Sequence, residues 1–237
     1  SPENIEFVQY VFKKLLENGY IYEKEIIQFY CKFDKKFLPD RYVIGTCPYC
    51  KAEDQYSDLC EKCGRVPAEI ENPRCAICKN PPTKEKTKHY FFKLANFIND
   101  LTGWLEENPH LQKDVKKYVQ NWIRDGLVDW DITRDISWGV PIPLPEAKGK
   151  VFYGWFDNHL AYISSSIKFL NDKGINGKKF WNSADIYHFI GKDIVYHHYL
   201  FLPAMRLGIK KEYKLPDYIP TRGHLMLQAK KISKSRN

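Results

Sequence analysis

The stretch "DIYHFIGKD", residues 185–193, decides the fold class. Its apolar run, "DIYHFIG" at 185–191, is typical of a buried β-strand and is followed by Lys192 and Asp193. A helical pattern comes next, with apolar residues at Tyr199, Leu200, Leu202, Met205 and Leu207. The sequence therefore predicts a buried strand, a polar turn and then a helix.

A second segment, "VFYGWFD" at 151–157, repeats this pattern. It is nearly all apolar and ends in Asp157, and helical spacing follows at Tyr162, Ile163, Ile167 and Leu170. Two buried strands that alternate with helices predict an α/β fold with a parallel sheet. Ligands of such sheets bind beyond the carboxyl ends of the strands, so Asp157 and the turn of Gly191, Lys192 and Asp193 mark the expected site.

The N-terminal part of the chain changes its pattern twice. Helical spacing predicts a first helix that stops at Asn18 and Gly19, with apolar residues at Ile5, Val8, Phe12, Leu15 and Leu16. Residues 28–82 lose this period and are rich in Cys, Pro, Lys and Asp, which indicates an inserted lobe without a core of its own. Beyond it, "HYFFKL" at 89–94 predicts a strand, and two helices are expected around 97–105 and 115–123, the second stopped by Gly126.

The composition of the chain is that of a globular protein. Its 237 residues suit one medium domain, or one domain that carries a sizeable insertion. The formal charge of +8 is compatible with an anionic partner such as nucleic acid or a nucleotide. No apolar run is long enough to cross a bilayer and no signal peptide is recognisable, so we expect no membrane partner. A start without an initiator methionine is typical of a fragment.

Four of the seven cysteines form one metal-binding pattern. Cys47, Cys50, Cys60 and Cys63 lie as two CxxC pairs separated by nine residues. Each CxxC directs two thiolates at one point, and four thiolates satisfy tetrahedral zinc with no open position. The sequence therefore predicts a structural zinc in a reducing compartment, and not disulfides.

The remaining cysteines form an incomplete second pattern. Cys75 and Cys78 make a third pair, and its natural partner is "CKFD" at 31–34, in which Asp34 stands in the place of the fourth cysteine. This is a candidate second zinc site with one altered ligand, Cys31, Asp34, Cys75 and Cys78. Because a carboxylate differs in shape from a thiolate, the sequence does not decide whether this second site binds zinc.

The terminal segment "KKISKSRN", residues 230–237, has two readings. A basic run at a terminus usually stays solvated, but Lys231 and Lys234 in a loop could also handle an anion. The segment itself does not decide between them.

Taken together, the motifs resemble methionyl-tRNA synthetase. The resemblance rests on "YHFIGKDIVYHHYLFLPA" at 187–204, "VFYGWFD" at 151–157, "ITRDISWG" at 132–139, the cysteine pattern after "LPDRYVIGTC" at 38–47, and "KISKS" at 231–235. They occur in that family's order and cover essentially the whole chain. The resemblance favours an anion-handling role for the terminal segment, as the mobile signature loop that closes over ATP.

The resemblance implies part of a Rossmann-type parallel-sheet catalytic domain with an inserted zinc-knuckle domain. Residues 1–19 would end the first half of the catalytic domain, and residues 20–149 would be the connective-peptide insertion, with zinc knuckles at 28–82. Residues 150–223 would be the second half, and residues 224–237 would begin the signature-loop region. The half with the His-Ile-Gly-His signature and a helical anticodon-binding domain would lie outside the chain.

Residue roles follow from the resemblance. It implies catalytic roles for Lys234, Lys231 and Arg134, methionine binding by Trp155, Tyr162 and His198, and ATP binding by Gly191, Asp193 and Lys234, with Mg²⁺. Simpler roles exist for several of them: a helix cap for Asp193, ordinary core for Trp155 and Tyr162, and a surface ion pair for Arg134.

Five positions depart from the family's usual residues. Asn158 and His159 follow "WFD" where a small residue and then Pro or Thr are usual, and His197 replaces Phe or Tyr. Arg222 stands where many members have His, and Ile232 stands where Met is usual. The first three bear on the shape of the methionine pocket.

The leading hypothesis is a cytoplasmic methionine–tRNA ligase that acts on methionine, ATP and tRNA(Met), with structural Zn²⁺. An alternative is a non-catalytic tRNA-binding paralogue of the same fold, although such a protein would not need an intact "KISKS" and "GKD". A third reading, a zinc-ribbon nucleic-acid module fused to an unrelated α/β domain, is disfavoured by the strand motifs. The oligomeric state stays open.

Overall fold

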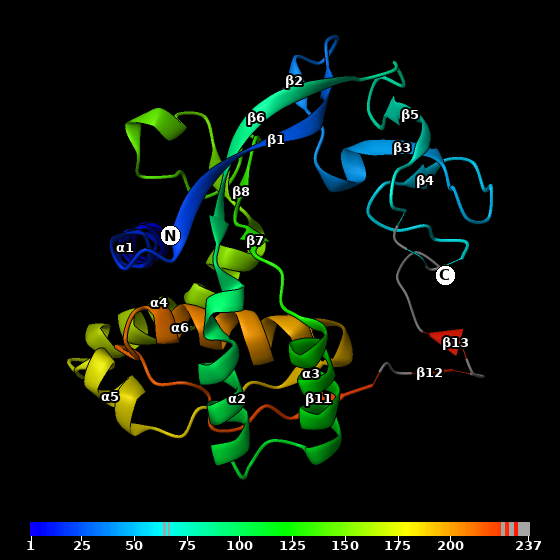
Figure 1. Cartoon of the computed structure of the whole chain (residues 1–237). Coiled ribbons are helices and arrows are strands. Elements are labelled where there is room, and N and C mark those ends of the chain that lie inside the picture. The colour runs from blue at the N-terminus through cyan, green and yellow to red at the C-terminus, as the bar shows by residue number, and fades with distance from the viewer. Residues whose placement is uncertain (64, 66, 224–225, 228–229, 232–237) are drawn as a thin grey trace. The chain divides into compact units, whose positions relative to one another are not determined.

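The structure is a computed structural model that describes residues 1–63, 65, 67–223, 226–227 and 230–231. The chain divides into two compact units (Figure 1). Ser1–Tyr22, Phe91–Trp130 and Gly154–Asn237 form the first, which we call the helical unit. Glu23–Tyr90 and Asp131–Tyr153 form the second, which we call the knuckle unit.

The helical unit begins with α1, Pro2–Glu17, as the sequence predicts. The hydroxyl of Ser1 accepts a hydrogen bond from the Asn4 backbone N–H (3.4 Å), and Pro2 occupies the first turn, where its missing N–H costs nothing. The helix buries a stripe of apolar side chains at Val8, Val11, Phe12 and Leu15. This stripe packs against α4, Gly154–Asp172, and α6, Leu202–Gly208.

Two glycines allow these helices to approach closely. A Cβ on Gly208 of α6 would lie 2.5 Å from a methyl carbon of Leu15. A Cβ on Gly177, at the start of α5 (Gly177–Ser183), would lie 2.7 Å from the backbone of Ile167 in α4. Glycine is therefore required at both positions by packing.

Two further helices confirm the periodicity expected around 97–105 and 115–123. A short 3₁₀ turn, η2, Leu94–Phe97, leads into α2, Ile98–Glu107, and α3 is Lys113–Asp125. Gly126 ends α3 with a φ of +97°, a conformation that side chains with a Cβ rarely adopt.

The strands of the helical unit are short. β10, Ile190–Gly191, pairs in parallel with β11, Thr221–Arg222, and Tyr187 forms a parallel bridge with Tyr218. β12, Met226–Leu227, pairs with β13, Lys230–Lys231, in antiparallel fashion. The strand expected at 185–191 is thus present at its carboxyl end, in the expected parallel arrangement.

The prediction of a strand over residues 151–157 is wrong for most of this range. Only β9, Val151–Phe152, is extended, and it pairs antiparallel with β8, Thr133–Arg134, in the knuckle unit. From Gly154 onward the chain is already α4, which buries residues at helical spacing, Phe156, His159, Leu160 and Ile163. A short apolar run cannot distinguish a buried strand from the first turn of a buried helix.

The knuckle unit contains most of a four-stranded sheet in the order β2-β1-β6-β7, of which residues 21–22, 91–92 and 130 belong to the helical unit. Its strands are β1, Ile21–Cys31, β2, Lys36–Phe37, β6, Thr83–Phe92, and β7, Trp130–Asp131. Exposed cross-strand ion pairs, Lys88–Glu23 (2.8 Å) and Lys86–Glu25 (2.7 Å), line its solvent side. The strand expected at 89–94 is therefore the end of the longer β6.

A three-stranded sheet, in the order β4-β3-β5, carries the cysteine loops. It consists of β3, Val43–Thr46, β4, Gln55–Tyr56, and β5, Glu71–Cys75. The 3₁₀ turns η1, Asp40–Tyr42, and η3, Pro145–Ala147, complete the unit.

The expectation that the inserted lobe has no core is wrong. Leu38, Val43 and Ile70 are at least 96% buried and pack with Cys31 and Cys75, and Phe29 and Cys78 lie against them. The core is small, and two of its five members are candidate metal ligands. In the described part of the chain, no helix is both long and apolar enough to cross a membrane.

Candidate functional site

The first turns of α4 present the aromatic group expected to contact methionine. Trp155 stacks on His197, with ring centroids 4.1 Å apart and planes at 33°. His197 opens η5, His197–Phe201, a single π-helical turn, and such turns are frequent at functional sites. The structure thus brings Trp155 together with one of the residues that depart from the family pattern.

Tyr162 and His198 form a hydrogen-bonded pair. His198 is fully buried, and its Nδ1 lies 3.0 Å from the carbonyl oxygen of Ile194. Because a carbonyl only accepts, Nδ1 carries the proton, and Nε2 is left to accept from the Tyr162 hydroxyl at 3.3 Å. Burial lowers the pKa of His198, although its bond to Ile194 acts the other way, and burial raises the pKa of Tyr162. The pair therefore consists of a neutral imidazole and a neutral phenol.

Three further histidines surround this pair and stay neutral. The ring centroid of His159 lies 5.0 Å from that of His198 and 5.7 Å from that of His197, and His188 lies 5.6 Å from His198. Burial, followed by the neighbouring histidines and Arg206, lowers the pKa of His159 to about 2. Burial also lowers the pKa of His188 to about 3 and that of His197 to about 4.

Several polar atoms of this cluster lack a hydrogen-bond partner among the described residues. They are both ring nitrogens of His159, Nδ1 of His197 and Oδ1 of Asp157. Burial raises the pKa of Asp157. Since native proteins pair nearly all buried polar groups, these atoms mark places where water, ligand or further protein is required. Asn158, the remaining departure in α4, is exposed.

The turn after β10 lies at a cavity of about 610 Å³. Lys192 and Asp193, in the 3₁₀ turn η4 (Lys192–Ile194), line it together with an aromatic wall of Tyr118, Trp122 and Tyr196. Asp193 is exposed and is not the cap of η4, because Gly191 holds that position. Gly191 has a φ of −83°, and a Cβ there would meet no described atom within 4 Å. The described chain itself gives no structural reason for glycine at this position.

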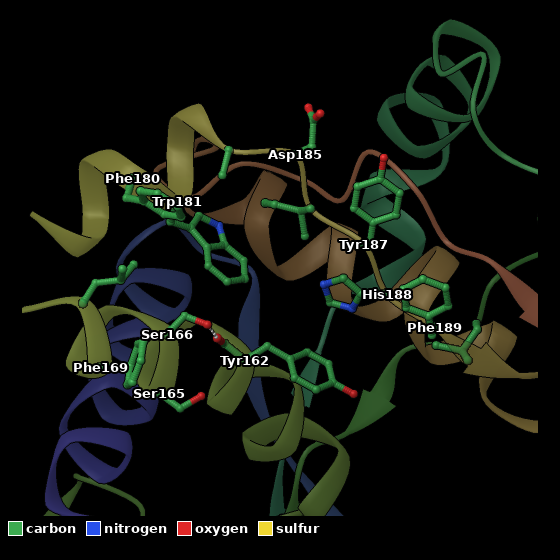
Figure 2. Close-up of a pocket in the computed structure, with 14 residues that line it drawn as sticks. Tyr162, Ser165, Ser166, Phe169, Phe180, Trp181, Asp185, Tyr187, His188 and Phe189 are labelled. Atoms are coloured by element: carbon green, nitrogen blue, oxygen red, sulfur yellow. Dashed lines mark hydrogen bonds between the residues drawn. The ribbon is translucent and has the colours of Figure 1, made fainter. Parts of the chain in front are cut away.

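A second hollow, of about 640 Å³, lies between α4, α5 and residues 184–190 (Figure 2). Tyr162 and His188 lie at one side of it, and Phe169, Phe180 and Trp181 supply an apolar wall. The sequence patterns did not indicate this groove.

Arg134 lies in the knuckle unit, on β8. Its Nη1 donates to the carbonyl oxygens of Thr133 (2.7 Å) and Asp131 (3.3 Å), and its guanidinium carbon lies 3.9 Å from the ring centroid of Tyr153. Its side chain is 13% exposed, and its Nη1 lies 3.3 Å from Oδ2 of Asp131, so Arg134 does form an ion pair, in a largely buried place. The ion cluster that surrounds it, centred on His89, was missed from the sequence because His89 lies 42 and 46 positions from its partners Asp131 and Asp135.

The terminal segment is only partly described. The backbone of Lys231 belongs to β13, whereas Ile232 and Lys234 lie outside the described residues. Arg222 is exposed at the end of β11, and its Nη1 donates to the Thr221 carbonyl at 3.4 Å.

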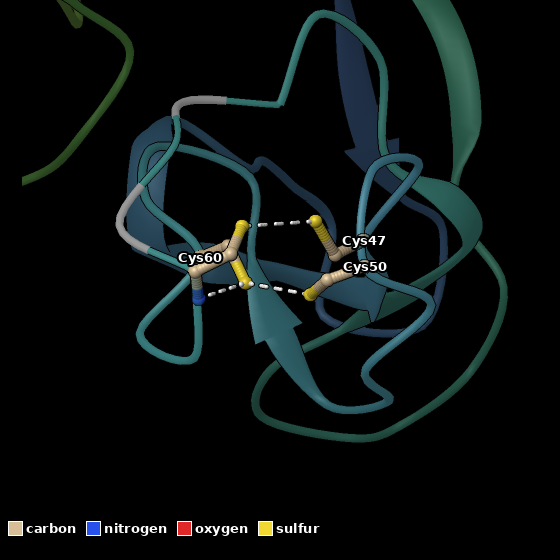
Figure 3. Close-up of side chains that lie close together, drawn as sticks. Cys47, Cys50 and Cys60 are labelled. Carbon is tan, nitrogen blue, oxygen red and sulfur yellow. Dashed lines mark hydrogen bonds between the residues drawn. The ribbon is translucent and has the colours of Figure 1, made fainter.

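The first cysteine cluster fits a tetrahedral metal. The ligand atoms of Cys47, Cys50, Cys60 and Cys63 all lie within 4.8 Å of one another. Sγ of Cys47 is 3.8 Å from that of Cys63, and Sγ of Cys50 is 3.6 Å from that of Cys60 (Figure 3). Zinc–thiolate bonds of about 2.3 Å require sulfur–sulfur edges of about 3.8 Å. The donor set and its spacing therefore suit zinc, and all four cysteines are free of disulfides.

The second cluster brings Asp34 into the fourth position. Oδ2 of Asp34 lies 3.2 Å from Sγ of Cys31 and 3.1 Å from Sγ of Cys75, and Sγ of Cys31 lies 3.4 Å from that of Cys78. A single carboxylate oxygen thus faces the thiolates, with all four ligand atoms within 4.8 Å of one another. Three thiolates and one carboxylate oxygen are a donor set that zinc accepts.

The loops that carry the ligands share one backbone conformation. The residue after the second ligand has a positive φ in three of them, at Lys35 (50°), Lys51 (57°) and Lys79 (63°). The loop of Cys31 and Asp34 therefore keeps the knuckle conformation although its second ligand is a carboxylate. In these three loops a lysine follows the second ligand, whereas Gly64 follows Cys63 in the sequence.

The fold has counterparts among solved structures. Mycobacterium tuberculosis methionyl-tRNA synthetase bound by methionyl-adenylate matches with a TM-score of 0.67, over 100% of this chain and 41% of that chain, at 22% sequence identity. Its apo form matches with a TM-score of 0.61, over 93% and 39%, also at 22% identity. At this identity the likeness establishes the fold alone, a mixed α/β fold like that of part of these synthetases.

Comparison of the sequence with known families assigns the chain to one family of synthetases. The family model described as tRNA synthetases class I (M) matches residues 1–237, so the chain belongs to that family. The methionine–tRNA ligase of Methanopyrus kandleri is 47% identical over 100% of this chain and 36% of its own length. That of Methanobrevibacter smithii is 46% identical over 98% and 35%. The chain spans about a third of the length of the curated relatives it matches.

Proposed function

We propose that the longer protein containing this chain is a cytoplasmic methionine–tRNA ligase. It would activate methionine with ATP to methionyl-adenylate and transfer the methionyl group to the 3′ end of tRNA(Met). The observation that carries the proposal is the match of the entire chain, at 46–47% identity, to proteins named methionine–tRNA ligase. The pairing of Tyr162 with His198, and the ring of His159 that contacts both His198 and Trp155, support it, because the resemblance assigns Trp155, Tyr162 and His198 to methionine binding.

We assign one group of residues to methionine and another to ATP. Trp155, Tyr162 and His198 would hold methionine, whose soft thioether is selected by shape and apolar contact. Asp193 would accept from the ribose hydroxyls, and Gly191 would leave room for the nucleotide. Lys231 and Lys234 would stabilise charge on the phosphates with Mg²⁺, because in-line attack at phosphorus depends on positioning and cationic groups, and Arg134 would act near the substrates.

The zinc sites would serve the fold. Cys47, Cys50, Cys60 and Cys63 would hold one zinc, and Cys31, Asp34, Cys75 and Cys78 a second, weaker one. In this assignment residues 20–149 are the connective-peptide insertion, with knuckles at 28–82, between residues 1–19 and 150–223 of the Rossmann-type catalytic domain. Residues 224–237 begin the signature loop.

The complete gene product should catalyse methionine-dependent exchange of pyrophosphate into ATP. Residues 1–237 alone should not, because they span only about a third of the length of the methionine–tRNA ligases they match. Exchange by the isolated chain would contradict the second statement. A complete product that binds tRNA(Met) without any exchange would instead be the non-catalytic paralogue.

Single variants of the complete protein test the assigned residues. Trp155→Ala should weaken methionine binding strongly and ATP binding little, because a flexible thioether depends on its aromatic wall. Calorimetric titration with each ligand measures this, and an equal loss for both would indicate a collapsed core. Lys234→Ala should slow adenylate formation by roughly a hundredfold to a thousandfold, with Lys230→Ala as the matched control in the same basic segment.

A further inference from the structure

The ion cluster of the knuckle unit is centred on His89. This residue of β6 is fully buried, and both of its ring nitrogens meet carboxylates. Nδ1 lies 2.7 Å from Oδ2 of Asp131, and Nε2 lies 2.9 Å from Oδ2 of Asp135. Lys150 pairs with the other oxygen of Asp135 and donates to Thr87 Oγ1 at 2.8 Å, and Thr87 in turn donates to Asp135 at 2.7 Å.

This geometry specifies the protonation of His89. An ionised carboxylate only accepts hydrogen bonds, so each ring nitrogen must carry a proton and the ring is an imidazolium. Burial by itself lowers the pKa of His89, but the hydrogen bonds and charges of Asp131 and Asp135 outweigh it and raise the pKa. Asp135 shows the converse: despite burial, His89, Lys150 and Thr87 lower its pKa to about 2.

The cluster is connected to Arg134 through one oxygen atom. Oδ2 of Asp131, which accepts from His89, also lies 3.3 Å from Nη1 of Arg134. The other oxygen of Asp131 accepts from the backbone N–H of Thr133 at 3.1 Å. His89 and Thr133 therefore hold the carboxylate from two sides, and the carboxylate, together with Tyr153, holds the guanidinium.

The charges of the cluster do not cancel. Three cations, His89, Lys150 and Arg134, face two carboxylates, Asp131 and Asp135, and one positive charge remains. A neutral residue at position 89 would leave two cations against two carboxylates. The imidazolium thus keeps Arg134 from being neutralised by its own neighbours, which a purely apolar packing residue could not do.

We propose that His89 is a positioning residue for Arg134: its imidazolium orients Asp131 and leaves the guanidinium with a net positive charge for an anionic substrate group of the reaction. This inference rests on the proposed function, because it assigns His89 to a residue expected to act in methionine activation. His89 itself touches no reacting atom in this scheme. It acts through Asp131, in the way that outer hydrogen-bonding partners orient the groups that contact substrate.

A double-mutant cycle in the complete protein tests the inference. His89→Gln keeps a hydrogen-bonding side chain but loses the charge, and should lower the kcat of methionine-dependent ATP–pyrophosphate exchange by roughly tenfold to a hundredfold. The KM for methionine should change less than threefold. In an Arg134→Ala background the same substitution should have almost no further effect on kcat, because residues that act through one another are not additive.

Thr87→Val is the matched control. It removes a hydroxyl of the same cluster that donates to Asp135 and accepts from Lys150, but it leaves the charge of the cluster unchanged, so it should lower thermal stability while kcat stays within about twofold of wild type. If His89→Gln fails to fold, Asp131→Asn takes its place in the cycle as a test of orientation: it preserves shape and weakens the contact to Arg134 without lowering the positive charge, so a loss of kcat that disappears in the Arg134→Ala background would come from orientation.

The outcomes separate the two proposals. Without exchange by the wild-type protein, the proposed function fails, and the role of His89 fails with it. With wild-type exchange, effects of His89→Gln and Arg134→Ala that simply multiply would show that His89 serves the fold alone and would overturn the inference. A His89→Gln effect that disappears in the Arg134→Ala background supports it.

Discussion

The helical unit and the knuckle unit are held together by different chemistry. In the helical unit aromatic rings interlock: Phe92 stacks on Phe97 at 5.4 Å, and Trp130 meets Phe201 at 3.8 Å between centroids. The knuckle unit also buries apolar residues, among them Ile132, Val151 and Phe152, but the part of it that carries the cysteines has only the small core of Leu38, Val43 and Ile70 beside its thiolates. A chain segment that buries little apolar surface needs bonds of another kind to be ordered.

Buried histidines show the same contrast at the level of one residue type. His159, His188 and His197 lie among rings and other histidines and have lowered pKa values. His89 lies between two carboxylates and has a raised pKa. Burial disfavours the charged form in every case, and the outcome depends on whether carboxylates are close enough to reverse it.

The largest difference in stability between the two units should follow removal of zinc. Cys60→Ala deletes a fully buried ligand of the first cluster and should unfold the knuckle unit, because structural zinc contributes about 10–16 kcal/mol of folding free energy in small zinc domains. The helical unit should keep its helices. Hydrogen exchange resolved by segment, together with zinc content per chain, measures both.

Chelation of the wild-type chain should reproduce this pattern without a mutation. Protection lost equally in α1 and α4 would show that the two units do not differ in this way. Folded wild-type protein that contains no zinc when purified without chelator would reject the zinc assignment.

Phe12→Ala should destabilise the helical unit and leave the zinc sites intact, the opposite of what is expected for Cys60→Ala. Phe12 is fully buried between α1 and its neighbours, and truncation of such a ring costs about 3–5 kcal/mol. The helical unit should lose stability while the zinc content stays unchanged. Phe169→Ala in α4, where the ring is 60% exposed, is the matched control and should change the unfolding free energy by less than about 0.5 kcal/mol.

The pH dependence of the two units should differ in sign. His159, with a folded pKa of about 2, is neutral in the folded state, so stability is lost as the pH falls below the unfolded value of about 6.5. The contribution of His89 is complete below about 6.5 and is lost as the pH rises through its raised folded pKa. Each group contributes at most about 1.4 kcal/mol per pH unit.

Exchange protection measured from pH 5 to pH 9 in the presence of zinc should therefore decline on the acid side in the helical unit and on the alkaline side in the knuckle unit. Histidine ring resonances followed by NMR would assign the titrations. An acid titration of His89 near 6.5 would contradict the imidazolium assignment.

Features set by local sequence were predictable. The extents of α1 and α3 follow from apolar spacing and from Pro2 and Gly126, and the first cysteine cluster follows from its spacing alone. What failed was the type of element at 151–157, because the run is too short to show whether its period is that of a strand or a helix.

Features that depend on distant segments could not be predicted. The bond between His89 and Asp131 joins residues 42 positions apart, and no local pattern indicates that the "HYFFKL" strand carries an imidazolium. The hydrogen bond of Tyr162 to His198 spans 36 positions, and only the resemblance suggested that they belong together. Within the candidate site, the sequence identified residue types, and the structure supplied their pairing.

The smallest effect on the fold should come from the second cluster. It allows a comparison of two metal sites within the knuckle unit. Cys31 and Cys75 lie within the small apolar core, so the packing of Leu38, Val43 and Ile70 remains when the metal is absent. We expect about two zinc ions per chain in the wild type, with the second released first by a chelator. Asp34→Ala should remove only that ion and lower the unfolding free energy of the knuckle unit by about 1–3 kcal/mol, far less than Cys60→Ala.

Asp34→Cys completes a four-thiolate set on a loop that already has the knuckle conformation, with Lys35 at a φ of 50°, and should slow release of the second ion. One zinc per chain in the wild type and two in Asp34→Cys would show that the carboxylate does not ligate.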